Sequence, residues 1–168
     1  MPRRILLTDV FYQPTVARAA GLLINDWTAT LPLIELIHES DELEEYVSGE
    51  FYRRELPHLL KLVGLAEDVD CVVVDAHVWL QEGLPGVGYF LWRALDEKIP
   101  VLGVAKSPYR EGSAQPLIRG QSKKPLWISS AGISTDQASS WISQMAGPYR
   151  IPQLLKRVDM LSRGDHHG

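Results

Sequence analysis

Four acidic residues and one lysine stand where a fold could bring their side chains together. Asp9 lies near the end of a first apolar run, Asp75 ends a later run, and Lys106 follows the next. Glu55 comes near the start of a predicted helix, and Asp159 lies beside the apolar stripe of the last predicted helix. Carboxylate oxygens are the ligands that Mg²⁺ prefers in proteins. The set is typical of a metal-dependent site for a phosphodiester, in which the lysine would hold a phosphate or orient the attacking water.

Two short apolar runs are expected to position the centre of this set. Residues 69–75 and 101–105 read as strands buried on both faces, and residues 86–97 between them leave room for a crossover helix. In open α/β sheets, functional residues gather outside the carboxyl ends of the strands. We therefore expect Asp75 and Lys106 to lie at neighbouring strand ends.

The rest of the chain supplies three further strands, more helices and several loops. The apolar patterns predict strands over 4–12, 16–27 and 31–38, an edge strand over 124–130, and helices over 50–65, 134–145 and 151–163. Residues 39–48 and 76–85 read as loops, and residues 110–123 as a hairpin or mobile loop. Pro57 either starts its helix or kinks it.

This order of elements predicts an α/β domain. Its mixed sheet would have three antiparallel strands and then parallel strands, and helices would flank it. We expect residues 1–163 to form a single domain and residues 164–168 to be a disordered tail.

Composition narrows the class of protein. The 168 residues are 45% apolar and 23% charged, as in an ordinary soluble globule. The single cysteine, Cys71, excludes a disulfide within the chain, which favours a reducing cytoplasm. No apolar run is long enough to span a membrane, and no signal peptide is apparent. We therefore expect a cytoplasmic protein that does not contact membranes.

Charge restricts how nucleic acid could bind. A net charge of −4 argues against a protein that coats nucleic acid through bulk positive charge. Local basic clusters could still form a groove, although we expect about half of these residues to be solvated surface charges. The clusters are Arg53/Arg54, Lys106/Arg110, Arg119/Lys123/Lys124 and Arg150/Lys156/Arg157.

Several short motifs resemble one family in their order. The runs Tyr46-Val-Ser-Gly49 and Tyr52-Arg-Arg-Glu55-Leu-Pro57 resemble the signature of the endonuclease V (deoxyinosine 3′ endonuclease) family, in which an aromatic wedge precedes an Arg-Glu pair. Four further pieces recur in the family's order: Asp9-Val-Phe-Tyr12, Val74-Asp75-Ala-His77, Gly103-Val-Ala-Lys106-Ser107 and Tyr149-Arg-Ile-Pro152. The resemblance covers nearly the whole chain and implies a ribonuclease-H-like fold.

The resemblance also implies an activity. It is that of a Mg²⁺-dependent endonuclease of DNA repair, with Mn²⁺ as a substitute, which nicks DNA or RNA 3′ to a deaminated base (inosine). Carried over, Asp9, Glu55, Asp75 and Lys106 would be catalytic, and Asp9, Glu55, Asp75 and Asp159 would bind metal. Tyr46 would wedge beside the lesion while the base flips into a pocket lined by Gly49 and Phe51. The implied nucleic-acid-binding residues are Tyr46, Gly49, Phe51, Arg54, His77 and Tyr109. No oligomer is predicted.

The departures from the family pattern concern the base pocket and the grip on DNA. Val78 replaces a glycine where a base edge would approach the backbone, Ser48 replaces the wedge proline, and Gln81-Glu-Gly replaces His-Pro-Arg. The sequence also begins at its first strand, without the family's N-terminal helix, which implies a divergent member. The alternative is therefore a catalytically weakened nucleic-acid-binding homologue with an altered pocket. A small-nucleotide hydrolase is disfavoured, because no glycine-rich phosphate loop is present.

Overall fold

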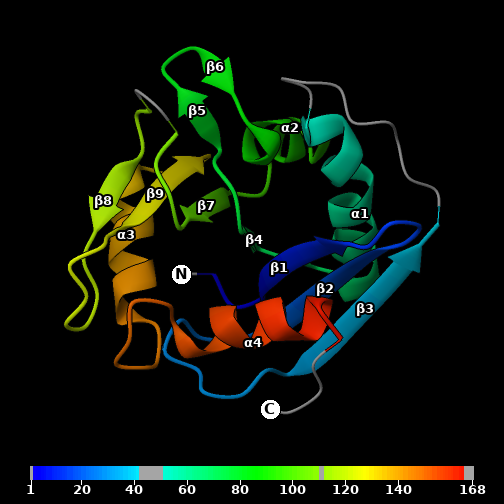
Figure 1. Cartoon of the computed structure of the whole chain (residues 1–168), viewed down its shortest axis with the longest axis horizontal. Coiled ribbons are helices and arrows are strands. Elements are labelled where there is room, and N and C mark those ends of the chain that lie inside the picture. Colours follow the sequence, from blue (N-terminus) through cyan, green and yellow to red (C-terminus); the bar gives the residue numbers. More distant parts are fainter. Residues whose placement is uncertain (1, 42–50, 110–111, 165–168) are drawn as a thin grey trace.

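A seven-stranded mixed sheet forms the centre of the molecule, and helices pack on both of its faces (Figure 1). The computed structural model describes residues 2–41, 51–109 and 112–164. In chain order the elements are β1 (Ile5–Tyr12), β2 (Ala17–Ile24), β3 (Ile34–Ser40), α1 (Phe51–Ala66), β4 (Cys71–Val74), β5 (Trp79–Gln81), β6 (Leu84–Pro85), α2 (Val87–Ala94), β7 (Val101–Ala105), β8 (Gln115–Leu117), β9 (Leu126–Ala131), α3 (Thr135–Gln144) and α4 (Gln153–Ser162).

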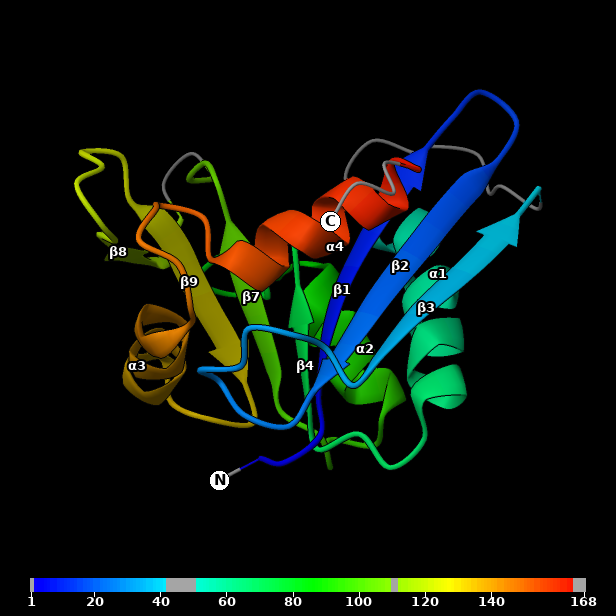
Figure 2. The same ribbon diagram turned by 90° about the horizontal axis from the view of Figure 1, so that it is seen from below.

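The strand order is β3-β2-β1-β4-β7-β9-β8, which can be followed across Figure 2. Strands β1, β2 and β3 pair antiparallel, β4 pairs parallel with both β1 and β7, and β9 returns antiparallel to β7. The predicted fold class, a mixed sheet with an antiparallel meander followed by parallel strands, is confirmed. The prediction of an edge strand at 124–130 is wrong, because β8 pairs with the outer side of β9 and takes the edge.

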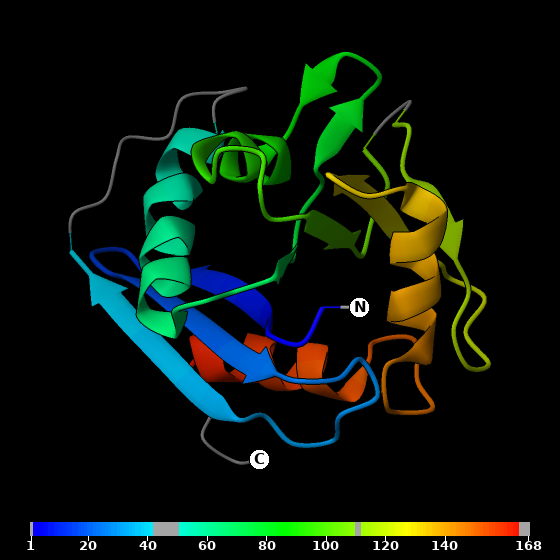
Figure 3. The same ribbon diagram turned by 180° about the vertical axis from the view of Figure 1, so that it is seen from behind.

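Two apolar cores lie on opposite faces of the sheet. Alternate residues of a strand point to opposite faces. In β1, Ile5 and Leu7 enter the core beneath α3 and α4, whereas Leu6 enters the core beneath α1 and α2. The stacked indoles of Trp27 and Trp141, with ring centroids 5.2 Å apart, lie in the first core. Figure 3 shows the molecule from behind, with α1 and α2 on one side of the strands and α4 on the other.

Three local differences from the sequence prediction have physical causes. Strand β3 begins at Ile34 rather than at residue 31, because Pro32 has no N–H to offer to a sheet ladder, and it runs on into the predicted loop as far as Ser40. The predicted loop 76–85 contains the two-stranded hairpin β5–β6. Pro57 lies inside α1, which begins at Phe51, so the proline does not start the helix.

The predicted cap of the third helix is present, since the Ser134 hydroxyl accepts a hydrogen bond from the Gln137 N–H. No helix in the described part of the chain is long and apolar enough to span a membrane. Of the predicted tail 164–168, residues 165–168 lie outside the described residues.

Candidate active site

Register brings Asp9 and Asp75 level with each other. The parallel pairing of β1 and β4 runs through Ile5–Cys71, Leu6–Val72 and Leu7–Val73, so two further steps along each strand place Asp9 opposite Asp75. Neighbouring strands are about 4.8 Å apart, which puts the two carboxylates within reach of one another. Asp9 shares its face with Ile5 and Leu7, and Asp75 continues the face of Cys71 and Val73. Both acids therefore face α4.

The pairing of β1 with β4 is reinforced beside the acids. The Thr8 hydroxyl donates a 2.7 Å hydrogen bond to the Val73 carbonyl, and the Val10 N–H donates a 2.9 Å bond to Asp9 Oδ1. The first bond ties β1 to β4, and the second fixes the orientation of the Asp9 carboxylate. Asp9 lies within β1 rather than at its end, but it lies beyond the last residue that pairs with β4.

Helix α4 supplies the third carboxylate. Leu154, Val158 and Leu161 pack into the first core and dock the helix against β1 and β2. Asp159 follows Val158, and single oxygens of Asp9, Asp75 and Asp159 all lie within 4.8 Å of one another. Arg163 Nε donates a 3.1 Å bond to Asp159 Oδ1 from one helical turn further on. We call these three acids the carboxylate cluster.

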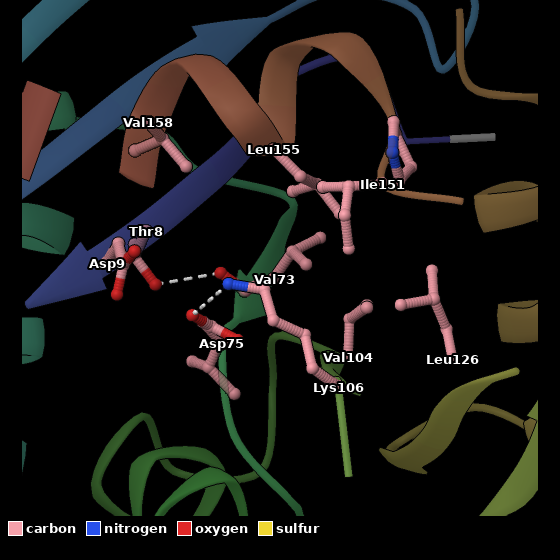
Figure 4. Close-up of a pocket in the computed structure, with 12 residues that line it drawn as sticks. Thr8, Asp9, Val73, Asp75, Val104, Lys106, Leu126, Ile151, Leu155 and Val158 are labelled. Atoms are coloured by element: carbon pink, nitrogen blue, oxygen red, sulfur yellow. Dashed lines mark hydrogen bonds and ion pairs between the residues drawn. The ribbon is translucent and has the colours of Figure 1, made fainter. Parts of the chain in front are cut away.

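Lys106 stands beside the carboxylate cluster at the end of β7. Its Nζ lies 3.6 Å from Asp75 Oδ2, and both side chains are partly open to solvent (Figure 4). Below them is a cavity of about 20 Å³, enough for about one water molecule. Asp9, Asp75 and Lys106 line one side of this cavity, and Val104 and Leu155 are among the apolar side chains on the other. A water or phosphate oxygen at this mouth would meet both acids and the ammonium.

Burial and crowding act on the protonation of these acids. Burial raises the pKa of Asp9 to about 8, with further contributions from the charge of Asp75 and a hydrogen bond to Asp159. Burial also raises the pKa of Asp75, although Lys106 opposes this. Burial disfavours the charged form of Asp159 too, but hydrogen bonds from Asp9 and Arg163 outweigh it and lower that pKa. The hydrogen bond between Asp9 and Asp159 thus favours a protonated Asp9 beside an ionised Asp159.

Glu55 lies outside the carboxylate cluster but near it. The side chain comes from the first turns of α1, on the opposite face of the sheet, and is only 6% exposed. Burial, followed by the charge of Asp75, raises its pKa to about 8. Because Glu55 is buried and lies close enough to Asp75 to feel its charge, it fits a site that is completed by a cation.

Of the residues that the resemblance implies as nucleic-acid ligands, the structure describes some side chains and not others. Arg54 lies over the Tyr12 ring, 4.2 Å from its centroid, and His77 Nε2 lies 3.0 Å from the Ser107 carbonyl oxygen. Tyr109 follows β7 and is half-buried. Tyr46 and Gly49 lie outside the described residues, as does the Phe51 side chain. Their roles in binding remain predictions.

Val78 is a core residue. Its side chain is fully buried, and its N–H donates a 2.9 Å bond to the Ser129 hydroxyl. A Cβ at Gly88 would lie 2.6 Å from Val78 Cγ2, so the absence of a side chain at Gly88 makes room for the valine. Val78 therefore packs into the core beneath α1 and α2, and the effect on a base pocket that the family resemblance implies stays a prediction.

Sequence reasoning missed the role of Arg119. This arginine is 6% exposed, and its guanidinium donates to the carbonyls of Met145 (2.6 Å), Gly147 (3.1 Å), Tyr149 (2.6 Å) and Arg150 (3.4 Å). It therefore holds the loop that leads into α4 and its Asp159. The sequence showed only a cationic residue in a basic, glycine-rich stretch, which carries no signal for burial.

Compared by sequence, the chain matches no protein-family model and no curated protein. Compared by structure, it matches an endonuclease V from Streptomyces avermitilis at 25% identity and a TM-score of 0.78, over 97% of this chain and 82% of that one. Human ENDOV matches at 22% identity and a TM-score of 0.81, over 97% and 84% of the two chains. An endonuclease V from Ciona intestinalis, solved with a 24mer DNA containing an inosine followed by a ribo-adenosine, matches at 15% identity and a TM-score of 0.81, over 98% and 85%.

Proposed function

We propose that this chain, which has the fold of the endonuclease V structures, is a metal-dependent endonuclease that hydrolyses a phosphodiester 3′ to a deaminated base, inosine, in DNA or RNA. The observation that carries the proposal is the meeting of Asp9, Asp75 and Asp159 within 4.8 Å, with Lys106 beside them. The inosine-containing DNA bound by the Ciona intestinalis protein supports the choice of substrate.

The residues present fit a divalent cation. Carboxylates crowded in this way disfavour the folded state unless a positive charge neutralises them, and hard cations such as Mg²⁺ or Mn²⁺ take oxygen ligands. Asp9, Asp75 and Asp159 would hold such an ion, with Glu55 as a further acid close by. When bound, a divalent ion supplies Lewis-acid stabilisation of the phosphoryl oxygens and eases deprotonation of the attacking water.

Lys106 would contribute to the same reaction. Its ammonium lies at the open mouth of the cavity, where it can pair with a non-bridging oxygen of the scissile phosphate and orient it toward the acids. The Asp75 carboxylate holds this ammonium in place. The Thr8–Val73 hydrogen bond ties β1 to β4, and the Val10–Asp9 bond orients the Asp9 carboxylate, so the acids need little rearrangement when substrate arrives.

A nicking assay tests the proposal directly. The substrates are an inosine-containing duplex and an inosine-containing single strand, in DNA and in RNA, each with Mg²⁺ or Mn²⁺. We expect a nick 3′ to the inosine that requires the metal and is lost in EDTA. Folded protein that cleaves none of these substrates in either metal would contradict the proposal.

The buried Val78 favours a second candidate function, a nucleic-acid-binding homologue with weak catalysis. In that case the protein binds nucleic acid without turnover, and Asp75→Ala leaves the affinity unchanged.

A Val78→Gly variant separates the two functions, because it opens the space that the valine fills. The nuclease proposal predicts faster cleavage at inosine in this variant, together with a loss of stability of about 2–4 kcal/mol from the cavity. Val78→Ala is the control for a smaller cavity, and cleavage rates and melting temperatures are measured for both.

The pKa of Asp9 predicts how the metal effect depends on pH. Its folded-state pKa of about 8 lies above the ordinary value of 3.8, so folding favours the protonated acid. The resulting stability is present at low pH and is lost as the pH rises toward and through 8. We therefore expect the melting temperature without metal to fall between pH 6 and pH 9.

A cation binds the deprotonated acids, so the rise in melting temperature on adding Mg²⁺ should be larger at pH 9 than at pH 6. Equal or absent shifts at both pH values would contradict a cation site that includes Asp9.

A further inference from the structure

A basic groove extends from the candidate active site along the ends of β7 and β9. It has a volume of about 390 Å³ and is lined by Lys106, Ser107, Lys124, Pro125, Trp127 and Arg150, together with a second proline. Lys106 also lines the cavity beneath the carboxylate cluster. The groove and the active site therefore share one side chain and adjoin at Lys106.

The charge of the groove is of one sign. Three cations line it, and no Asp or Glu is among the described residues that do so. Lys124 is exposed, and within the described ranges it has no carboxylate partner. On a protein whose net charge is −4, this is a local positive region beside an acidic cluster. Such a region attracts an anion that passes from the active site, as the next phosphates of a nucleic-acid strand would.

Arg150 builds one wall of the groove and fixes its shape. Its guanidinium donates to the carbonyl of Lys106 and, at 2.8 Å, to the carbonyl of Pro125. These bonds tie the end of β7 to the start of β9, while the charge of Arg150 remains at the groove. The wall is therefore set before a ligand arrives, which reduces the entropy lost on binding.

Trp127 gives the groove an aromatic residue. It is half-buried on β9, opposite Ala105 of β7. Grooves that combine cations with aromatic side chains are typical of single-stranded nucleic-acid binding, because an unpaired base can stack on the ring while the backbone follows the charges. In a duplex, both faces of each base are already covered by its neighbours.

We propose that this groove binds the substrate strand next to the bond that is cut, a proposal that rests on the nuclease function proposed above. The phosphates of the strand would lie against Lys124 and Arg150, and an unpaired nucleotide would stack on Trp127. The strand is single-stranded where it crosses the groove. The groove thereby sets a preference for substrates that continue unpaired beyond the active site.

Binding without cleavage tests the groove separately from the nuclease activity. Fluorescence anisotropy in EDTA measures the affinity of the full chain for a labelled oligo-dT and for a duplex of the same length, at several salt concentrations. We expect Lys124→Glu to weaken single-strand binding roughly fivefold or more and to lower the salt slope by about 1. Trp127→Leu should weaken it by a similar factor, and Trp127→Phe, which keeps a ring, by less.

Lys123→Glu is the matched control, because Lys123 is exposed and adjacent to Lys124 but does not line the groove. Equal effects of Lys123→Glu and Lys124→Glu would overturn the proposal, since bulk charge would then explain both. Equal losses on single strand and duplex, or a wild-type protein that binds no oligonucleotide, would overturn it as well. Lys124 is on the surface, so its variants stay informative if Trp127→Leu fails to fold. If the groove variants lose affinity but no substrate is ever nicked, the proposed nuclease function is wrong, whereas the proposal that the groove binds single-stranded nucleic acid is supported.

Discussion

Replacing Asp75 by asparagine is expected to reduce cleavage by about a thousand-fold and to leave the fold intact. Asp75 belongs to the carboxylate cluster and also holds Lys106, so Asp75→Asn removes a metal ligand and the partner of the ammonium. Loss of several kcal/mol of transition-state stabilisation corresponds to a factor of this size. The single-turnover cleavage rate on the inosine substrate, at saturating Mg²⁺, measures the effect.

The same substitution should not lower the stability of the metal-free protein. The negative charge of Asp75 helps to raise the pKa values of Asp9 and Glu55, so its removal relieves repulsion among buried acids. We expect the melting temperature in EDTA to stay level or rise, and the stabilisation by Mg²⁺ to disappear. Asp136→Asn, on the exposed first turn of α3, is the matched control; it should lower the melting temperature slightly, because the acid interacts favourably with the helix dipole, and leave the stabilisation by Mg²⁺ unchanged. A variant that cleaves at the wild-type rate would remove Asp75 from the site.

Replacing Arg119 by methionine is expected to cost about 3–5 kcal/mol of folding free energy. The substitution leaves the carbonyls of Met145, Gly147, Tyr149 and Arg150 without their shared donor inside the fold. Hydrogen bonds from a charged donor are each worth about 1.5–3 kcal/mol, and unsatisfied buried acceptors carry a further penalty. For a chain of this length, we expect the melting temperature to fall by roughly 10 °C.

Activity should fall with stability in this variant, because the loop that Arg119 holds leads to Asp159 and contains Arg150. Arg119→Lys keeps the charge but offers fewer donors, so it should lie between the wild type and Arg119→Met. Lys123→Met, on the exposed surface nearby, provides the baseline. If Arg119→Met melted within a degree of Lys123→Met, the four hydrogen bonds would have no net effect on stability.

The fold could be predicted from sequence where the apolar pattern is strong. Buried runs such as CVVV in β4 and VLGVA in β7 have no polar residue to place at a surface, and they mark the parallel centre of the sheet. Short strands carry too little pattern, which is why the β5–β6 hairpin was missed. The three residues of β8 were predicted only within a possible hairpin, and without them β9 looked like the edge.

The candidate site could be predicted in part. Asp9 and Asp75 follow from strand order and register, and the structure places them side by side. Which further acid joins them depends on how α1 and α4 dock, and helix docking is set by packing that a single sequence does not show. Asp159 joins the carboxylate cluster, whereas Glu55 approaches from the other face. The role of Arg119 depends on backbone carbonyls far along the chain, which leave no mark in local composition.

The carboxylate cluster joins residues that are far apart in the sequence, since Asp9 comes from β1 and Asp159 from α4. During synthesis on the ribosome, a nascent chain that has emerged only as far as β9 already carries Asp9, Asp75 and Lys106 but not the third acid. The carboxylate cluster is complete only after α4 has left the exit tunnel and docked. Molecules that are unfinished or cleaved before α4 therefore lack an assembled carboxylate cluster.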